Sequence, residues 1–126
     1  DILSVNYKAD YTPTIIGEEK ISDINTIKLE LIAKTPTVTY YKIVIFVNKN
    51  DFKPVKSEFY SKTEKLLKSG FYRKYQKIGG KNICIEILIV HNIMKENITV
   101  VNYSNFKVED ISESFFNKDM LKDLQL

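Results

Sequence analysis

Residues 71–90 read FYRKYQKIGGKNICIEILIV and predict a β-hairpin. The pair Gly79-Gly80 separates two stretches rich in β-branched and aromatic residues. Glycine readily adopts the positive φ angles that a two-residue hairpin turn requires, because it has no Cβ atom. We therefore expect the strand that ends near Lys77 to pair antiparallel with the strand that begins near Ile83.

Segments on both sides of this hairpin also have strand patterns. Apolar and charged residues alternate over 27–31, and residues 55–60 show the same period of two, which is typical of half-buried strands. In two segments, 40–47 and 83–93, apolar residues occupy both the odd and the even positions and so lie on both faces of the strand. This pattern predicts central strands or strands covered on both sides. With a further turn at 92–97 and a strand over 98–106, residues 53–106 are predicted to form a four-stranded meander.

The composition also favours a β protein. Ile, Val, Thr, Tyr and Phe account for 49 of the 126 residues, whereas Ala occurs only twice. Turn-forming residues recur at short intervals, so we expect breaks at sites such as Thr12-Pro13 and Gly17. Helix candidates are 61–69, for which a turn followed by a strand is the alternative, and 111–124. The prediction is a mainly β, curved antiparallel sheet with at most short helices, in a single domain over 1–126.

Net charge, the length of the apolar runs and the first residues disfavour several classes of function. The formal net charge of +3 is small, and we take it to be spread along the chain, so no nucleic-acid partner is predicted. The longest apolar run, residues 43–47, is far shorter than the roughly 18 to 20 residues of a membrane helix. The first residues, Asp1-Ile2-Leu3-Ser4, do not have the pattern of a signal peptide, so any targeting segment is expected to have been removed.

Groups suited to catalysis are scarce. His91 is the only histidine and Cys84 the only cysteine. Strand parity places His91 with the isoleucines of residues 83–89 and Cys84 on the opposite face, so a Cys–His pair fails unless a bulge intervenes. Gly79-Gly80 does not fit a phosphate-binding loop, and the carboxylates are scattered. We predict no catalytic residue, no metal site and no cofactor.

The remaining candidate site is the apolar face of the predicted sheet. Three interpretations stay open: an ordinary sandwich core, a curved sheet around an apolar ligand, and an outer-membrane barrel with lipid outside. We expect the concave face to carry Ile43, Ile45, Ile85 and Ile87, because Lys42 and Glu86 occupy the opposite one. The candidate ligand-lining residues are Ile43, Ile45, Val47, Val55, Phe59, Leu67, Phe71, Ile83, Ile85, Ile87, Ile89, Val101 and Tyr103.

Four segments carry a resemblance to a known family. Residues 41–56, YKIVIFVNKNDFKPVK, give a strand that ends in valine, an amide-rich turn and a proline entering the next strand. Residues 10–31, 77–81 and 110–124 add three further motifs in order, so the match covers nearly the whole chain. Together they resemble the LolA-like outer-membrane lipoprotein-sorting proteins. The family's glycine after the Glu-Glu-Lys segment is replaced by Ser22-Asp23, and the portion that precedes these motifs in the family is missing.

The resemblance implies an unclosed, half β-barrel whose concave apolar face is covered by helices. It implies a bacterial periplasmic carrier of lipoprotein acyl chains or other lipid, with membrane association left open and an inner-membrane lipoprotein exporter as a partner. The chain is then expected to be the C-terminal half of a longer domain, with an uncovered apolar face that the missing N-terminal portion, a second copy or lipid would cover. The alternatives are an RseB-like sensor of lipid or misfolded protein and a lipid-acting hydrolase.

Overall fold

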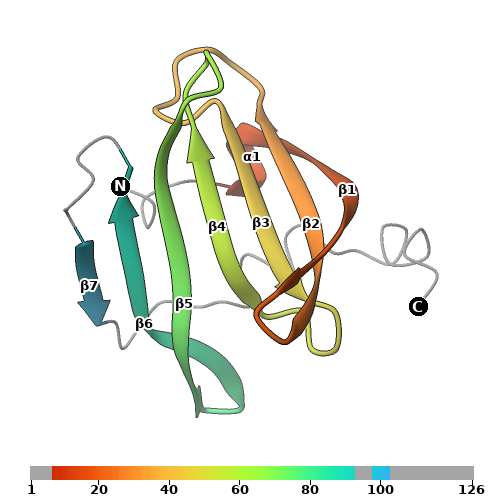
Figure 1. Ribbon diagram of the computed structural model, residues 1–126, viewed down its shortest axis with the longest axis vertical. Helices are drawn as coiled ribbons and strands as arrows, with labels where there is room; N and C mark the ends of the chain where they lie inside the picture. Colours follow the sequence, from red (N-terminus) through yellow and green to blue (C-terminus); the bar gives the residue numbers. More distant parts are fainter. Residues whose placement is uncertain (1–6, 93–97, 103–126) are drawn as a thin grey trace.

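The computed structural model describes residues 7–92 and 98–102, which form one twisted antiparallel sheet (Figure 1). The elements are α1 (Tyr7–Asp10), β1 (Tyr11–Ile21), β2 (Ile24–Ala33), β3 (Lys42–Asn48), β4 (Pro54–Tyr60), β5 (Leu66–Ile78), β6 (Lys81–His91) and β7 (Ile98–Asn102). Each strand pairs only with its neighbours in sequence, in the order β1-β2-β3-β4-β5-β6-β7. Because β1 and β7 do not pair within this part of the chain, the sheet is unclosed. The predicted mainly β, unclosed fold is confirmed.

The β5–β6 hairpin has the predicted turn. Gly79 and Gly80 have φ angles of 57° and 80°, and Ile78 pairs with Lys81 across them. Positive φ at both central residues is the signature of a type I′ turn, whose twist matches that of the strands. Of the two helix candidates, 61–69 is a turn followed by the start of β5, and 111–124 lies outside the described residues.

Strand β1 runs through two positions where we expected breaks. Pro13 lies opposite Leu31 in the ladder, and the register shifts between Ile15 and Gly17. The expectation was wrong because β1 is an edge strand, where proline is tolerated and glycine often forms a bulge. Gly17 has a φ of 152°, which a residue with a Cβ rarely adopts. The following turn places Ser22 at a φ of 53°, in the left-handed region that glycine adopts most easily.

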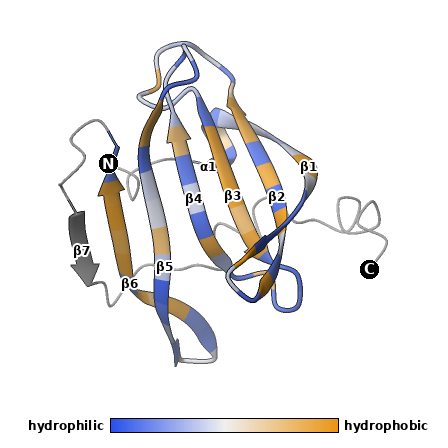
Figure 2. Ribbon diagram, viewed as in Figure 1, coloured by the Kyte–Doolittle hydropathy of each residue, from blue (hydrophilic) through white to orange (hydrophobic). Residues whose placement is uncertain are grey.

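The two faces of the sheet differ in chemistry. Along the strands, Figure 2 shows hydrophobic residues most continuous on β3 and β6, with more hydrophilic residues on β4. We call one the core face; from β2, β3 and β4 it carries Leu29, Leu31, Ile43, Ile45 and Phe59, all fully buried. We call the other the outer face; from the same strands it carries Lys28, Glu30, Val44, Phe46, Lys56 and Glu58.

Strand β3 is buried on both faces, as its continuous apolar sequence predicts. Phe46 on the outer face is only 2% exposed. Its register partners are Lys28 and Lys56, whose Nζ atoms lie 5.5 and 5.4 Å from the centre of its ring. The aliphatic stems of lysines can cover apolar surface while their ammonium groups stay in water, and a cation near a ring face is attracted to it. The outer face therefore has a small apolar layer covered by charged residues.

Candidate functional site

The core face has one continuous buried cluster, which receives side chains from α1 and from β1 to β6. Six of the residues predicted to line a ligand site lie in it: Ile43, Ile45, Val47, Phe59, Ile87 and Ile89. Leu67 packs against the cluster from β5. The other members are Tyr7, Tyr11, Leu29, Leu31, Ala33, Tyr40, Tyr72 and Cys84.

Phe71 does not belong to the core face, and its placement there from sequence was wrong. Its register partners are Lys56 on β4 and Leu88 on β6, so it lies on the outer face. The Nζ atom of Lys56 is 5.6 Å from the centre of the Phe71 ring. The core-face residue of this pair of neighbours is Tyr72, which is 6% exposed. The pattern at 71–72, two adjacent aromatic residues, does not itself distinguish the two faces.

A double irregularity in the β5–β6 ladder changes the parity of β6. Tyr72 pairs with Ile87, Lys74 with Glu86 and Tyr75 with Cys84, so the ladder skips one residue on each strand. Beyond this point the core position is taken by Cys84, whereas the sequence pattern places the isoleucines there. Simple alternation therefore assigned Ile83 and Ile85 to the core face incorrectly; Ile83 is buried and Ile85 half-buried, and neither is in the cluster.

Three further residues predicted to line the ligand site, Val55, Val101 and Tyr103, are not part of the buried cluster as the structure describes it. Val55 is half-buried beside the register shift between β3 and β4. Val101 lies in β7, where its backbone pairs with Ile87. Tyr103 lies outside the described residues.

Cys84 lies on the core face, contrary to the expectation from parity, but it forms no pair with His91. Six residues of strand lie between them, so their Cα atoms are roughly 23 Å apart at about 3.3 Å per residue. Burial raises the pKa of the Cys84 thiol, and its Sγ atom donates to the Glu86 carbonyl oxygen at 3.3 Å. A buried thiol with a raised pKa is a poor nucleophile. Within the described ranges, no cluster of His, Cys, Asp or Glu could hold a metal ion.

Tyrosines are the largest group of core-face residues that the predicted lining set left out, beside Leu29, Leu31, Ala33 and Cys84. Tyr7, Tyr11, Tyr40 and Tyr72 are in the cluster, and Tyr75 packs against it. Tyr40 also stacks near Phe59, with ring centres 5.0 Å apart at an angle of 57°. The signal available in the sequence was the abundance of tyrosine, eight of 126 residues, in a chain without tryptophan.

Three of these tyrosines have a hydrogen-bond partner for the hydroxyl group inside the protein. Tyr11 donates to the Tyr40 carbonyl, and Tyr75 donates to the Pro54 carbonyl. The Tyr72 hydroxyl lies 2.9 Å from Ser57 Oγ, which is also buried. Because a buried polar atom without a partner is costly, these bonds offset the cost of taking the hydroxyl groups out of water while the rings add apolar surface.

Burial also keeps these phenols protonated. It raises the pKa of Tyr7 well above the ordinary value and that of Tyr72 to about 12, in spite of the Ser57 hydrogen bond, which lowers it. Burial is also the main cause that raises the pKa of Tyr11 to about 12, with the nearby Asp10 carboxylate adding to it. The core face therefore carries no charge from tyrosine at neutral pH.

The free energy of unfolding is expected to fall as the pH rises from 10 to 12. An unfolded tyrosine ionises near pH 10, whereas folded Tyr11 and Tyr72 hold their protons up to about pH 12. Between these values the unfolded state binds fewer protons, so higher pH favours unfolding. Urea titrations at several pH values will measure this loss, which Tyr72→Phe should reduce. If the free energy of unfolding falls equally with pH in the unchanged chain and in Tyr72→Phe, the raised pKa of Tyr72 does not cause the loss.

Solved structures with the same fold include a LolA superfamily protein from Nitrosomonas europaea. The sequences are 33% identical, the TM-score is 0.73, and the match covers 90% of this chain and 52% of that one. This chain is LolA-like. It also belongs to the family whose model matches residues 1–123 and carries the description "-like: Uncharacterized protein".

Two more distant structures share the fold of this LolA-like chain. A DUF1329 family protein from Desulfovibrio piger has 24% identity and a TM-score of 0.68, over 89% of this chain and 47% of that one. A domain assigned to outer-membrane lipoprotein sorting, from Vibrio parahaemolyticus, has 19% identity and a TM-score of 0.63, over 82% and 47%. The chain thus spans about half the length of these structures. A search of curated proteins finds no match.

Among the described residues, α1 is the only helix, and no helix is long and apolar enough to cross a bilayer.

Proposed function

We propose that this LolA-like chain carries lipoprotein acyl chains, or other lipid, in the bacterial periplasm. The observation that supports the proposal is the composition of the core face. Its buried cluster joins strands β1 to β6, and no charged side chain is fully buried among the described residues. The charged group nearest to the cluster on this face is half-buried Lys68, which pairs with Phe59 and has its Nζ atom 5.7 Å from the centre of the Tyr40 ring. An apolar buried surface of this kind suits a hydrocarbon chain, which favours a carrier over a hydrolase.

Binding in such a carrier would come from burial of the hydrocarbon. Each buried CH₂ contributes about 0.8 kcal/mol, so a dozen would contribute on the order of 10 kcal/mol before the costs of ordering the ligand. Release of the cargo then requires a partner or a movement of the cover. An inner-membrane lipoprotein exporter is the donor that we propose for the cargo.

The core face is not uncovered in the structure, although we expected an exposed apolar face. Leu29, Ile45 and Ile87 are fully buried, and the large hydrophobic side chains exposed among the described residues are Ile16 and Ile78. Tyr7 of α1 is part of the buried cluster, with its ring 6.5 Å from that of Tyr11. We propose that α1 is one element that must move when an acyl chain enters.

The share of the matched structures that the chain covers also supports a proposal about the domain. We propose that residues 1–126 correspond to the C-terminal half of a longer LolA-like domain. The 52% coverage of the Nitrosomonas protein supports this. The other half, or a second copy of the chain, would then complete the cover of the core face.

Uptake of an acylated peptide tests the carrier proposal. We expect the chain to bind a fluorescent palmitoylated peptide and not the same peptide without its acyl group. Leu67→Ala should weaken this binding about five-fold, because Leu67 packs against the core cluster and its truncation removes apolar contact. Fluorescence anisotropy with a titration of protein measures both affinities.

A neighbouring residue supplies the matched control. Leu66 is also half-buried on β5 but does not pack against the cluster, so Leu66→Ala should leave the affinity unchanged. Equal binding of the peptide with and without its acyl group would argue against a carrier and for recognition of unfolded protein. Release of free fatty acid from a palmitoyl ester would instead indicate a hydrolase.

A further inference from the structure

The end of the β5–β6 hairpin extends beyond the strands on either side. Within the described residues, β4 pairs with β5 only as far as Phe71, and β7 pairs with β6 only from Glu86. Residues 72–85 therefore form a two-stranded ribbon at the lower end of the molecule in Figure 1. The two register shifts bend this ribbon, and the hydrogen bond from Tyr75 to the Pro54 carbonyl holds its base.

The ribbon is rich in basic residues. Residues 73–86 contain Arg73, Lys74, Lys77 and Lys81 but a single acid, Glu86, which gives the segment a net charge of +3. This equals the formal net charge of the whole chain, because the remaining residues carry fifteen basic and fifteen acidic side chains.

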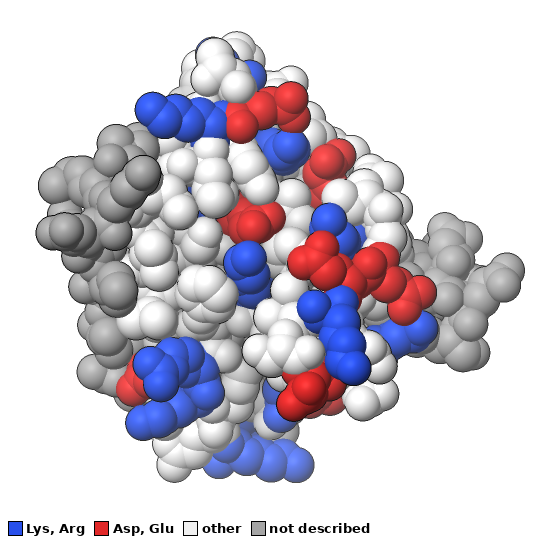
Figure 3. All heavy atoms as spheres, viewed as in Figure 1, with Lys and Arg blue, Asp and Glu red and all other residues white. Residues whose placement is uncertain are grey.

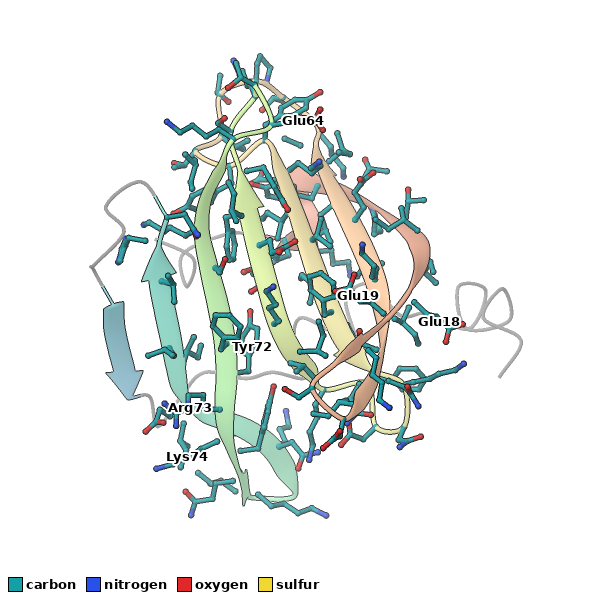
Figure 4. All side chains as sticks on the ribbon, in the orientation of Figure 1. Glu18, Glu19, Glu64, Tyr72, Arg73 and Lys74 are labelled. Carbon is teal, nitrogen blue, oxygen red and sulfur yellow. The ribbon has the colours of Figure 1, made fainter. Side chains whose placement is uncertain are left out.

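The cations of the ribbon face solvent. Arg73 Nε and Lys74 Nζ lie 3.7 and 3.5 Å from the carboxylate oxygens of Glu86, and the two basic side chains are 53% and 63% exposed. Lys77 and Lys81 are exposed beside the turn. Figure 3 shows basic side chains gathered at this lower end, where Figure 4 labels Arg73 and Lys74.

An exposed apolar side chain lies among these cations. Ile78 precedes the Gly79-Gly80 turn, follows Lys77 and pairs with Lys81. It is 42% exposed, whereas the other large hydrophobic residues whose burial the structure describes, apart from Ile16, are buried or half-buried. A projecting turn that combines an aliphatic side chain with several cations has the chemistry of a membrane-surface anchor, since cations attract anionic headgroups and apolar atoms enter the interface.

We propose that the tip of the β5–β6 hairpin docks on bilayers that contain anionic phospholipid. The cations of residues 73–81 face the lipid phosphates, and Ile78 enters the headgroup region. Charge complementarity selects an anionic surface, and the aliphatic tip favours lipid over nucleic acid, whose bases stack on aromatic side chains. This inference goes beyond the carrier proposal and does not require it, because the ribbon lies at one end of the sheet and its tip residues are outside the core cluster.

Vesicle co-sedimentation of the full chain tests this assignment. We expect binding to vesicles of phosphatidylcholine with one-third phosphatidylglycerol, little binding to pure phosphatidylcholine, and weaker binding at high salt, which screens exposed charges. Lys77→Glu combined with Lys81→Glu should reduce binding at least about thirty-fold, because each cation near an anionic surface contributes about 1 kcal/mol. Ile78→Ser should reduce it about five-fold and leave the salt dependence unchanged.

Two control variants make the same change in net charge, and the same loss of an isoleucine side chain, at other exposed positions. Lys34→Glu combined with Lys62→Glu changes exposed lysines in the loops after β2 and β4, and Ile16→Ser removes the other exposed isoleucine. Both should bind vesicles like the unchanged chain, and circular dichroism will show that each variant is folded. An equal loss in these controls, or no preference for anionic vesicles, would overturn the proposal. Binding to polyglutamate without binding to vesicles would also overturn it and would assign the tip to an acidic protein.

Acylated-peptide uptake by the same variants separates the two proposals. Vesicle binding without uptake would leave the membrane anchor standing and reject the carrier. Uptake without vesicle binding would do the reverse.

Discussion

Phe59→Ala is expected to lower the free energy of unfolding by about 4 kcal/mol. Phe59 is fully buried on the core face, pairs with Ile43 across β3 and β4, and packs near the Tyr40 ring. Removal of the ring takes away apolar burial and leaves a cavity that the neighbouring strands cannot fill without breaking their ladders. Since small domains are stable by only about 5 to 15 kcal/mol, this is a large part of the total. Urea unfolding measures it.

Phe71→Ala is the matched control for Phe59→Ala, because it removes the same ring from the other face. Phe71 is half-buried on the outer face, where the Nζ atom of Lys56 lies 5.6 Å from the centre of its ring. We expect a loss of about 1 kcal/mol, since water can occupy the space and less area is buried. The sequence pattern placed both phenylalanines on one face, whereas the register places them on opposite faces. Similar losses for the two variants would contradict the register.

Val44→Asp is expected to cost at least about 3 kcal/mol. Val44 is 5% exposed on the outer face, and its register partners are Glu30 on β2 and Glu58 on β4. An aspartate there would be desolvated and would form a row of three carboxylates across adjacent strands. Urea titration at neutral pH is again the measurement, and lowering the pH towards the carboxylate pKa range should recover part of the loss.

Val44→Lys tests the sign of the charge at the same position. The lysine stem can lie along the sheet and bring its ammonium group near Glu30 and Glu58. We expect it to be more stable than Val44→Asp by about 2 kcal/mol, and the difference should shrink at high salt, which screens these charges. If the two variants are equally unstable at every salt concentration, burial alone determines the cost and the outer-face carboxylates have no part in it.

The fold was largely predictable because its signals are local. Alternation over 27–31, the double apolar parity of 40–47 and the Gly79-Gly80 turn each act within a few residues, and the meander joins neighbours in sequence. Strand β1 was harder to predict, because Pro13 and Gly17 are breakers by composition and only their place on an edge strand makes them compatible with a ladder.

The candidate site was less predictable, since it depends on where alternation fails. Alternation gives correct core positions on β3 and at Ile87 and Ile89, but it fails at Phe71 on β5. Beyond the register shifts at residues 72–75 and 84–87, Cys84 takes a place expected for Ile83 or Ile85. Bulges of this kind are set by the pairing of two strands, so a single strand pattern does not reveal them. The tyrosine contribution was missed for a related reason: the acceptors of Tyr11 and Tyr75 are carbonyls 29 and 21 residues away in sequence.

The nearest-neighbour order of the seven strands has a consequence for how the protein folds. Each ladder joins strands that are consecutive in the chain, so every pairing closes a short loop and the entropy cost of contact formation stays small. Each strand can pair as soon as its successor is available, without waiting for the far end of the polypeptide. We therefore expect the sheet to grow by sequential addition during synthesis or passage through a pore, with each finished hairpin offering its edge to the next strand.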